Sequence, residues 1–449
     1  MSPHIDTRIT DAVAASAIPL RGAAAEYDPL LQLIGNARFV LLGEASHGTH
    51  EFYRERARIT QRLIAEHGFT AVAVEADWPD AYRVNRYVRG NGEDRDSDAA
   101  LSGFKRFPTW MWRNQDVVEF VDWLHDWNRK QPSGATRVGF YGLDLYSLFT
   151  SISEVLRYMQ RVDPEAALQA RKRYACFDHY DRDSQRYGYS ASVEAAASCE
   201  DQVIAQLHQL QDRAFDYVRR EESDAAEAYF YAQQNARLVV NAEEYYRTMF
   251  RGRVSSWNLR DRHMADTLDA LSQHLSHTTG KPAHIVVWEH NSHIGDARAT
   301  EVGQQGEWTL GQLAREAYGD DAVLIGFSTH HGTVTAASDW DAPAERKRVR
   351  PALSGSIESA FHHSGIERFL LPLKSTNRAV LALSEPHLQR AIGVIYRPQT
   401  ERHSHYFYTR LPRQFDAILH FDETRAVVPL EPTGGWHAGE APETYPEGT

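Results

Sequence analysis

The strongest constraint in this sequence is an alternation of short apolar runs with longer amphipathic segments. Two apolar runs, "ARFVLLGE" (37–44) and "TAVAVEAD" (70–77), have the length and character of buried strands. Between them, "FYRERARITQRLIAEHG" (52–68) has helical periodicity and ends on a glycine, a common helix stop. The same pattern returns in "TRVGFYGLD" (136–144), "AHIVVWEH" (283–290) and "DAVLIGFSTH" (321–330). Strands that alternate with helices pair in parallel through right-handed crossovers, so we predict an α/β fold with a mostly parallel sheet flanked by helices.

The stretch from 145 to 280 departs from this alternation, because its pattern is almost entirely helical. No repeat, low-complexity tract or linker marks a domain boundary on either side of it. We therefore predict one domain over 1–449 that carries a large helical insertion over 145–280, which is a candidate lid. Further strands are predicted in the last part of the chain at "GTVTAAS" (332–338), "AIGVIYR" (391–397) and "AILHFDE" (417–423).

Composition limits the partners that the chain can have. Its 49 Lys and Arg against 61 Asp and Glu give a formal charge of −12, which argues against nucleic acid as the main partner, because phosphate binding needs a basic surface. No run approaches the roughly 20 apolar residues of a membrane span, and the N-terminus does not resemble a signal peptide. Cys176 and Cys199 form no disulfide framework and no metal motif, which is typical of a reducing compartment. We expect a cytoplasmic protein with no membrane partner, and the sequence leaves its oligomeric state open.

Acidic residues stand at the ends of four predicted strands. They are Glu44, Glu75, Asp144 and Glu289. Two of these strand ends also carry histidines three residues apart, which are His47 and His50, and His290 and His293. In open parallel sheets, ligands bind beyond the carboxyl ends of the strands. Any one such acid could simply cap a helix, but the set together predicts a polar centre at one edge of the sheet.

Arg56 lies on the apolar face of the helix predicted after the first strand. Phe52, Ile59 and Leu63 form an inward stripe, and Arg56 falls on it four residues after Phe52. A buried arginine needs a carboxylate or an anionic group to meet. Arg56 could therefore form a structural Arg–Glu pair, or it could face negative charge that develops during a reaction.

Several familiar chemistries lack their motifs in this chain. There is no GxSxG elbow and no HExxH helix, and no Walker loop or GxGxxG follows a strand, so no nucleotide cofactor has a visible cradle. Ser46 adjoins His47, but neighbouring residues rarely place a nucleophile and its base in hydrogen-bond reach. We expect no cofactor. A divalent metal ion is the alternative, because histidines and carboxylates are also metal ligands.

The polar residues lie within a set of segments that together resemble the erythromycin esterase-like family. The segments are "LLGEASHGTHEFYRERARIT", "AVAVEADWPDAYRVNRYV", "FKRFPTWMWRN", "VGFYGLDLYSL", "SWNLRDRHMADTL", "VVWEHNSHIGD", "IGVIYRPQTERHSHYF" and "FDAILHFDETRAVVPL", and they span about residues 35 to 430. The resemblance implies an α/β core with helical elaboration and hydrolysis of macrolide lactones, an antibiotic-resistance activity. It implies that His47 is catalytic with Glu44 as its acid. It also matches Arg56, Glu75, Trp288, His290 and His293 to family motifs.

From these residues we expect an ester or lactone hydrolase that acts on a small molecule. His47 would activate water, Glu44 or Glu75 would orient its ring, and Arg56 or His290 would stabilise the oxyanion, without an acyl-enzyme. His293, Asp144 and Trp110 are candidate substrate-binding residues, although the aromatic stretch 104–112 could instead be core packing. His330 and His331, at another strand end, are expected to be structural. A metal-dependent hydrolase at the same site, or a non-catalytic metabolite-binding homologue, is the alternative function, and the natural substrate stays open.

Overall fold

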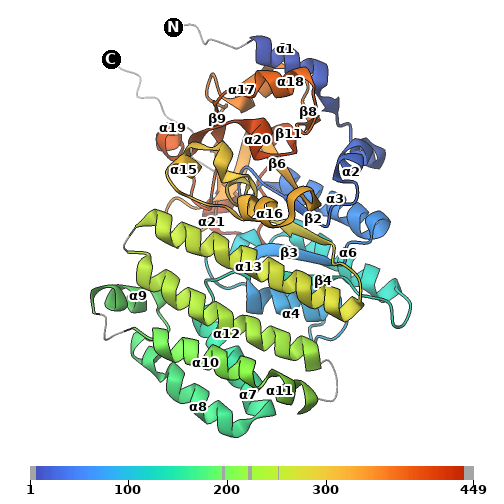
Figure 1. Cartoon of the computed structure of the whole chain (residues 1–449). Coiled ribbons are helices and arrows are strands. Elements are labelled where there is room, and N and C mark those ends of the chain that lie inside the picture. The colour runs from blue at the N-terminus through green and yellow to red at the C-terminus, as the bar shows by residue number, and fades with distance from the viewer. Residues whose placement is uncertain (1–6, 195–197, 221–224, 251, 439–449) are drawn as a thin grey trace.

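The computed structural model describes residues 7–194, 198–220, 225–250 and 252–438. Within these ranges a nine-stranded, mostly parallel sheet forms the centre (Figure 1), which confirms the predicted α/β fold class. The strands lie in the order β1-β8-β11-β6-β2-β5-β3-β4, with β7 paired to β6, and β9 and β10 form a separate hairpin. Their bounds are β1 Ile18–Pro19, β2 Phe39–Leu42, β3 Ala71–Asp77, β4 Gly139–Asp144, β5 Ile285–Trp288, β6 Ala322–Ala336, β7 Glu345–Val349, β8 Arg368–Pro372, β9 His387–Arg390, β10 Tyr406–Thr409 and β11 Ala417–Thr424.

Both faces of the central strands are buried, and this explains their continuous apolar sequence. Successive side chains of a strand point to opposite faces. Phe39 and Leu41 of β2 accordingly belong to one hydrophobic core cluster, and Val40 and Leu42 belong to the other. All four side chains are fully buried. The six strands from β11 to β4 pair in parallel with one another, so their carboxyl ends share one edge.

Helices cover the two faces of this sheet. Those outside the long helical stretch are α1 Thr7–Ser16, α2 Asp28–Ile34, α3 His50–His67, α4 Trp78–Val88, α5 Ser97–Leu101, α6 Gln115–Lys130, α14 Asn291–Ile294, α15 Glu301–Gln304, α16 Leu310–Tyr318, α17 Ile357–His363, α18 Arg378–Ala382, α19 Glu401–Ser404, α20 Leu411–Gln414 and α21 Gly434–Ala438. Helix α3 connects β2 to β3 and ends at Gly68, which adopts the left-handed conformation (φ +69°) that glycine tolerates.

A stack of helices lies beside the β4 side of the sheet, with α13 running across β3 and β4 (Figure 1). Its members are α7 Leu148–Val162, α8 Pro164–Tyr174, α9 Ser184–Val193, α10 Glu200–Asp212, α11 Ala214–Arg220, α12 Ala225–Thr248 and α13 Arg253–Thr279. They share one core cluster with a face of the sheet, so the stack is packed on the sheet through a continuous apolar interior. A lid function for this layer stays a prediction.

The expectation for the two cysteines is wrong. Cys176 and Cys199 are joined by a disulfide between Cα atoms 6.0 Å apart, contrary to our expectation that the two would not form one. Their separation of 23 residues gave no pairing signal, because the stack that brings them together is specified by packing.

In the part of the chain that the structure describes, no helix is both long and apolar enough to cross a membrane.

Gly43, between β2 and Glu44, allows a close approach of three strand ends. A Cβ atom at this position would overlap the side-chain amide of Asn291. That amide donates from Nδ2 to the carbonyl oxygen of Phe327 (2.7 Å), and the backbone N–H of Asn291 donates to the carbonyl oxygen of Glu44 (2.9 Å). Asn291 therefore fixes the loop after β2 relative to the ends of β5 and β6.

We predict that Gly43→Ala destabilises the protein by about 1–3 kcal/mol, because the added methyl group overpacks a closed contact. Denaturant unfolding followed by circular dichroism measures the loss. Gly434→Ala is the control, because a Cβ atom there meets nothing within 4 Å. If both variants unfold at the wild-type midpoint, Asn291 moves aside freely and the close approach is unimportant.

Candidate active site

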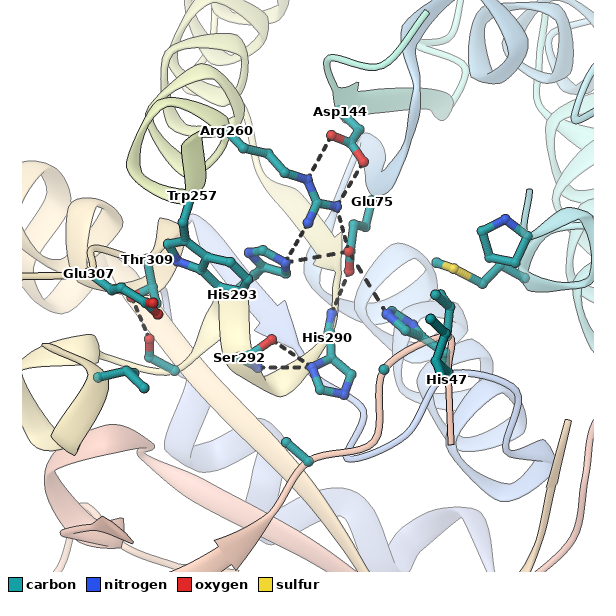
Figure 2. A pocket seen from close by; sticks show the side chains of 18 of the residues that line it. His47, Glu75, Asp144, Trp257, Arg260, His290, Ser292, His293, Glu307 and Thr309 are labelled. Atoms are coloured by element: carbon teal, nitrogen blue, oxygen red, sulfur yellow. Dashed lines mark hydrogen bonds and ion pairs between the residues drawn. The ribbon is translucent and has the colours of Figure 1, made fainter. Parts of the chain in front are cut away.

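Side chains from four neighbouring strand ends surround a cavity of about 870 Å³ at the carboxyl edge of the sheet. Among the residues singled out from the sequence, five line it: His47, Glu75, Asp144, His290 and His293 (Figure 2). Glu44 and Arg56 lie behind His47 rather than on the cavity surface. The strand order β2-β5-β3-β4 makes these ends neighbours, although they are far apart in sequence.

His47 is held by a buried carboxylate that is itself held by a buried cation. Nδ1 of His47 lies 2.7 Å from Oε1 of Glu44, and Nη2 of Arg56 donates to Oε2 of the same carboxylate at 2.9 Å. Arg56 is 1% exposed, and its guanidinium also lies over the ring of Tyr53 at 4.4 Å. The carboxylate must accept from His47, so Nδ1 carries a proton and Nε2 is the basic nitrogen.

This arrangement decides between the two roles considered for Arg56. Its guanidinium is engaged by Glu44 and by the surrounding aromatic rings, and it is absent from the cavity wall. The idea that Arg56 meets developing negative charge on a substrate is therefore not supported. Its position is that of a buried Arg–Glu pair beneath the histidine.

The electrostatic surroundings favour a basic His47. Burial opposes protonation of the ring, but the negative charges of Glu75 and Glu44 outweigh it and raise the pKa of His47 above its usual 6.5. Nε2 of His47 lies 4.0 Å from Oε1 of Glu75. A protonated His47 would thus face a carboxylate at each ring nitrogen.

His290 is positioned as a neutral hydrogen-bond donor. Its Nδ1 accepts from the backbone N–H of Ser292 at 3.2 Å, so the ring proton belongs on Nε2. That Nε2 is buried and makes no hydrogen bond of standard geometry among the residues that the structure describes, and the backbone of Ala45 is a nearby acceptor for it. Burial, together with the neighbouring His47, lowers the pKa of His290 well below its usual value. The two imidazole rings lie 4.7 Å apart between centroids.

Glu75 lies at the centre of the polar floor, where Arg260 of helix α13 reaches it (Figure 2). Nη2 of Arg260 donates to Oε1 of Glu75 at 2.8 Å, and the same guanidinium donates twice to Asp144, at 3.0 and 2.8 Å. Oε2 of Glu75 accepts from the backbone N–H of His290 at 2.8 Å. Burial favours the neutral acid, but the interactions with His293, His47 and Arg260 hold the pKa of Glu75 well below its usual range.

His293 is fixed from the helical layer as well. Its Nδ1 lies 3.0 Å from both oxygens of Asp261, its Nε2 lies 2.9 Å from Nη1 of Arg260, and the ring of Trp257 stacks on it at 4.5 Å. Trp257, Arg260 and Asp261 were not predicted from the sequence, because we looked for site residues at strand ends, on the helix after the first strand and in the stretch 104–112, and not within the helical insertion. The signal was present in "SWNLRDRHMADTL", where an Arg and an Asp stand next to each other on a helix of the insertion.

Two other predicted residues take different positions. Glu289 is fully buried, and neither of its oxygens has a partner in the described part of the chain. Burial, reinforced by Glu75, raises the pKa of Glu289 well above its usual value, so it is a neutral acid beneath the floor. Trp110, expected to contact substrate, is 3% exposed and packs in the core beside Gly48.

The cavity wall is mixed, with aromatic and apolar side chains alongside many polar and charged ones. The stretch 104–112 contributes to it through Phe104, Phe107 and Trp112 in place of Trp110. Residues of the segment 391–407, which runs into the second strand of the small two-stranded sheet, also line the cavity. From the helical layer only α13 reaches the cavity, through Trp257 and Arg260. Such a wall suits an organic ligand that has both apolar and polar groups.

The floor is a poor match for a metal ion. A guanidinium nitrogen already lies 2.8 Å from Glu75, where a cation would have to bind. Among the described residues, a group of histidine and carboxylate atoms that lie close enough together to bind a metal ion is found outside the cavity. Its members are His330, His362 and Asp422. The hydroxyl of Ser46 is bound to that of Thr49, and Ser46 does not line the cavity.

Comparison with known proteins gives a consistent result. The family model described as erythromycin esterase matches residues 64–424. Erythromycin esterase type II of Escherichia coli is 22% identical, covering 89% of this chain and 92% of that protein, and erythromycin esterase type I of the same organism is 21% identical, covering 88% and 92%. A solved succinoglycan biosynthesis protein aligns with a TM-score of 0.76 at 21% identity, over 95% of this chain and 100% of that one. A histidine-to-asparagine mutant of the erythromycin esterase EreC, in its open conformation, aligns with a TM-score of 0.67 at 17% identity, over 90% and 95%.

We predict that Glu75→Gln lowers the pKa of His47. Removing the facing negative charge withdraws a stabilising interaction from the imidazolium, so the ring should lose its proton at lower pH than in the wild type. An NMR titration of histidine-labelled protein measures the value directly. Asp116→Asn is the matched control, because Asp116 contacts a different histidine, His50, at 2.7 Å. An unchanged His47 titration in Glu75→Gln would remove Glu75 from this electrostatic scheme.

Proposed function

The chain belongs to the erythromycin esterase family, as its motifs predicted, and on that premise we propose that it hydrolyses an ester or lactone bond by direct attack of water. The single observation that carries the proposal is the chain of contacts from Arg56 through Glu44 to His47. It leaves the basic Nε2 of His47 at a cavity large enough for an organic substrate. Family membership supports a hydrolase, and the detailed mechanism is our inference from these contacts.

In this mechanism His47 accepts a proton from water as the water attacks the carbonyl carbon. Glu44 fixes the ring through Nδ1 and, like the acid of a catalytic triad, stabilises the imidazolium that forms. Glu75 faces the other nitrogen across 4.0 Å, a gap that a water molecule can bridge. Glu75 would thereby hold the attacking water and share in stabilising the charged ring.

The oxyanion of the tetrahedral intermediate needs a donor, and His290 is our candidate. Its Nε2–H is buried, makes no hydrogen bond of standard geometry among the described residues, and belongs to a ring whose lowered pKa keeps it neutral. A neutral imidazole can donate a hydrogen bond to developing negative charge without first losing that proton. Arg260 has a positioning role, because it holds Glu75 and Asp144 in place.

The substrate class follows from the walls and from the relatives. The cavity volume of about 870 Å³ lies within the range of pockets that hold drug-sized ligands. Two relatives are named as erythromycin esterases, so we propose a large lactone of the macrolide class as the first substrate to test. Ring opening would inactivate a macrolide antibiotic, and the protein would then act as a cytoplasmic resistance enzyme.

Incubation with macrolides and simple aryl esters, followed by mass spectrometry, should reveal a product heavier by one water. A panel without turnover would favour a binding protein instead.

We predict that His47→Asn lowers kcat by the ~10²–10⁴-fold typical of lost acid–base catalysis, with folding intact. Asparagine keeps the polarity of the side chain but cannot accept a proton near neutral pH. His50→Asn is the control, because His50 lies in the same segment but pairs with Asp116. Steady-state kinetics and circular dichroism are the measurements. Near-wild-type turnover by His47→Asn would refute the assignment.

We also predict that Ser46→Ala retains most of the activity and that no acyl-enzyme accumulates. Ser46 is 1% exposed, and its hydroxyl is bound to Thr49 rather than to His47. With an aryl ester as substrate, rapid-quench kinetics should show no burst of phenol release ahead of steady-state turnover. An acyl group trapped on any serine and detected by mass spectrometry would replace direct water attack with covalent catalysis.

A further inference from the structure

A cluster of two histidines and one carboxylate lies on β6, β11 and α17. The strand ends that build the active cavity belong to β2, β5, β3 and β4, which lie on the other side of β6 from β11 in the sheet. Its members are His330 of β6, His362 of α17 and Asp422 of β11. None of the three lines the cavity or contributes to the proposed hydrolysis. Because β6 and β11 are adjacent parallel strands, the cluster is built on the rigid part of the sheet.

The register of these two strands brings His330 and Asp422 together. Thr329 pairs with Phe421 and His331 pairs with Glu423, so Asp422 lies beside His330 on the same face. Two residues earlier on that face, Ser328 pairs with His420, and the Ser328 hydroxyl contacts Nδ1 of His420 at 2.9 Å. Position 330 is further fixed by Arg390, whose Nη2 donates to the His330 carbonyl oxygen at 2.7 Å.

Helix α17 covers this face and supplies the third member from its last turn. The ring of His362 stacks on that of His330 with centroids 3.9 Å apart and planes 8° apart. Nδ1 of His362 lies 2.8 and 2.9 Å from the two oxygens of Asp422. The ligand atoms of all three residues lie within 4.8 Å of one another. The side chain of His362 is 38% exposed, so an ion can reach the cluster from solvent.

We propose that His330, His362 and Asp422 bind a divalent transition-metal ion, with zinc as the best match. Two imidazole nitrogens and one carboxylate oxygen are a ligand set that zinc accepts at about 2.0–2.2 Å, with water in the fourth position. The ion would enter between Nδ1 of His362 and the carboxylate, in place of the proton that now joins them, and the His330 ring would turn out of the parallel stack so that its nitrogen faces the same ion. It would tie α17 to β6 and β11, and it would stabilise the folded chain because the unfolded chain has no such site.

The test uses the full-length, tag-free protein, stripped with chelator and then titrated with Co²⁺ as a spectroscopic probe and with Zn²⁺ in calorimetry. We expect one ion per chain, visible absorption bands from bound Co²⁺, and a higher Tm in the presence of Zn²⁺. His362→Gln and His330→Gln should weaken binding by more than about tenfold and abolish the Zn²⁺-dependent rise in Tm. His363→Gln is the matched control, because His363 is the next residue of the same helix and its Nδ1 contacts the carbonyl oxygen of Ser359.

Three outcomes would overturn the proposal. The wild-type protein could fail to bind either ion, and the cluster is then only a stacked pair with a salt bridge. Binding could persist unchanged in His362→Gln and His330→Gln. Binding could instead be lost in His293→Gln, which would assign the ion to the active cavity. Circular dichroism verifies that each variant folds, and His362→Gln remains informative if the more buried His330→Gln does not. Metal binding is measured without substrate, so the result does not depend on the proposed hydrolysis.

Discussion

The site depends on the way Glu44 divides its two carboxylate oxygens. One oxygen meets Nδ1 of His47 and the other meets the guanidinium of Arg56, and all three residues are at most 5% exposed. A buried carboxylate is costly unless it is paired, and Arg56 supplies the pairing charge from the inward stripe of α3. Glu44 can then dictate which nitrogen of His47 carries the proton. The orientation and basicity of the catalytic candidate thus follow from a helix face that never touches the cavity.

A second set of charges follows the same logic with another arginine. Arg260 neutralises Glu75 and Asp144, which come from two adjacent strand ends and would otherwise repel each other in a buried floor. The floor is therefore densely charged, with two carboxylates sharing one guanidinium, and it sits beneath walls that contain several aromatic side chains. A polar floor under such walls suits a large organic molecule with one reactive carbonyl. Glu289 has no such partner, and its buried acid stays neutral.

Much of this could be predicted from the sequence, because strand ends in a parallel sheet meet at one edge. Apolar runs located β2, β3, β4 and β5, and the polar residues after them converge as a parallel sheet requires. Residues fixed by tertiary packing escaped this reasoning. Arg260 reaches the floor from a helix, and a short 3₁₀ turn (Thr109–Met111) places Trp112 rather than Trp110 on the wall. The predicted strand 391–397 is an irregular segment with isolated bridges to Ser46 and Ala337, because its neighbours are loops.

The attachment of Arg260 to α13 has a consequence for how such proteins can diversify. The helices of this layer, α7 to α13, are consecutive in the chain, so the layer resembles a module that recombination exchanges as a unit. Exchange would remove the guanidinium of Arg260, which pairs with Glu75 and Asp144, together with the aspartate and tryptophan that hold His293. The core would then carry uncompensated buried charge, a defect far more costly than lost surface contacts. The helical layer and the sheet must therefore change together during evolution. Changes in ligand preference are more accessible through the loops 104–112 and 391–407 than through exchange of the helical layer.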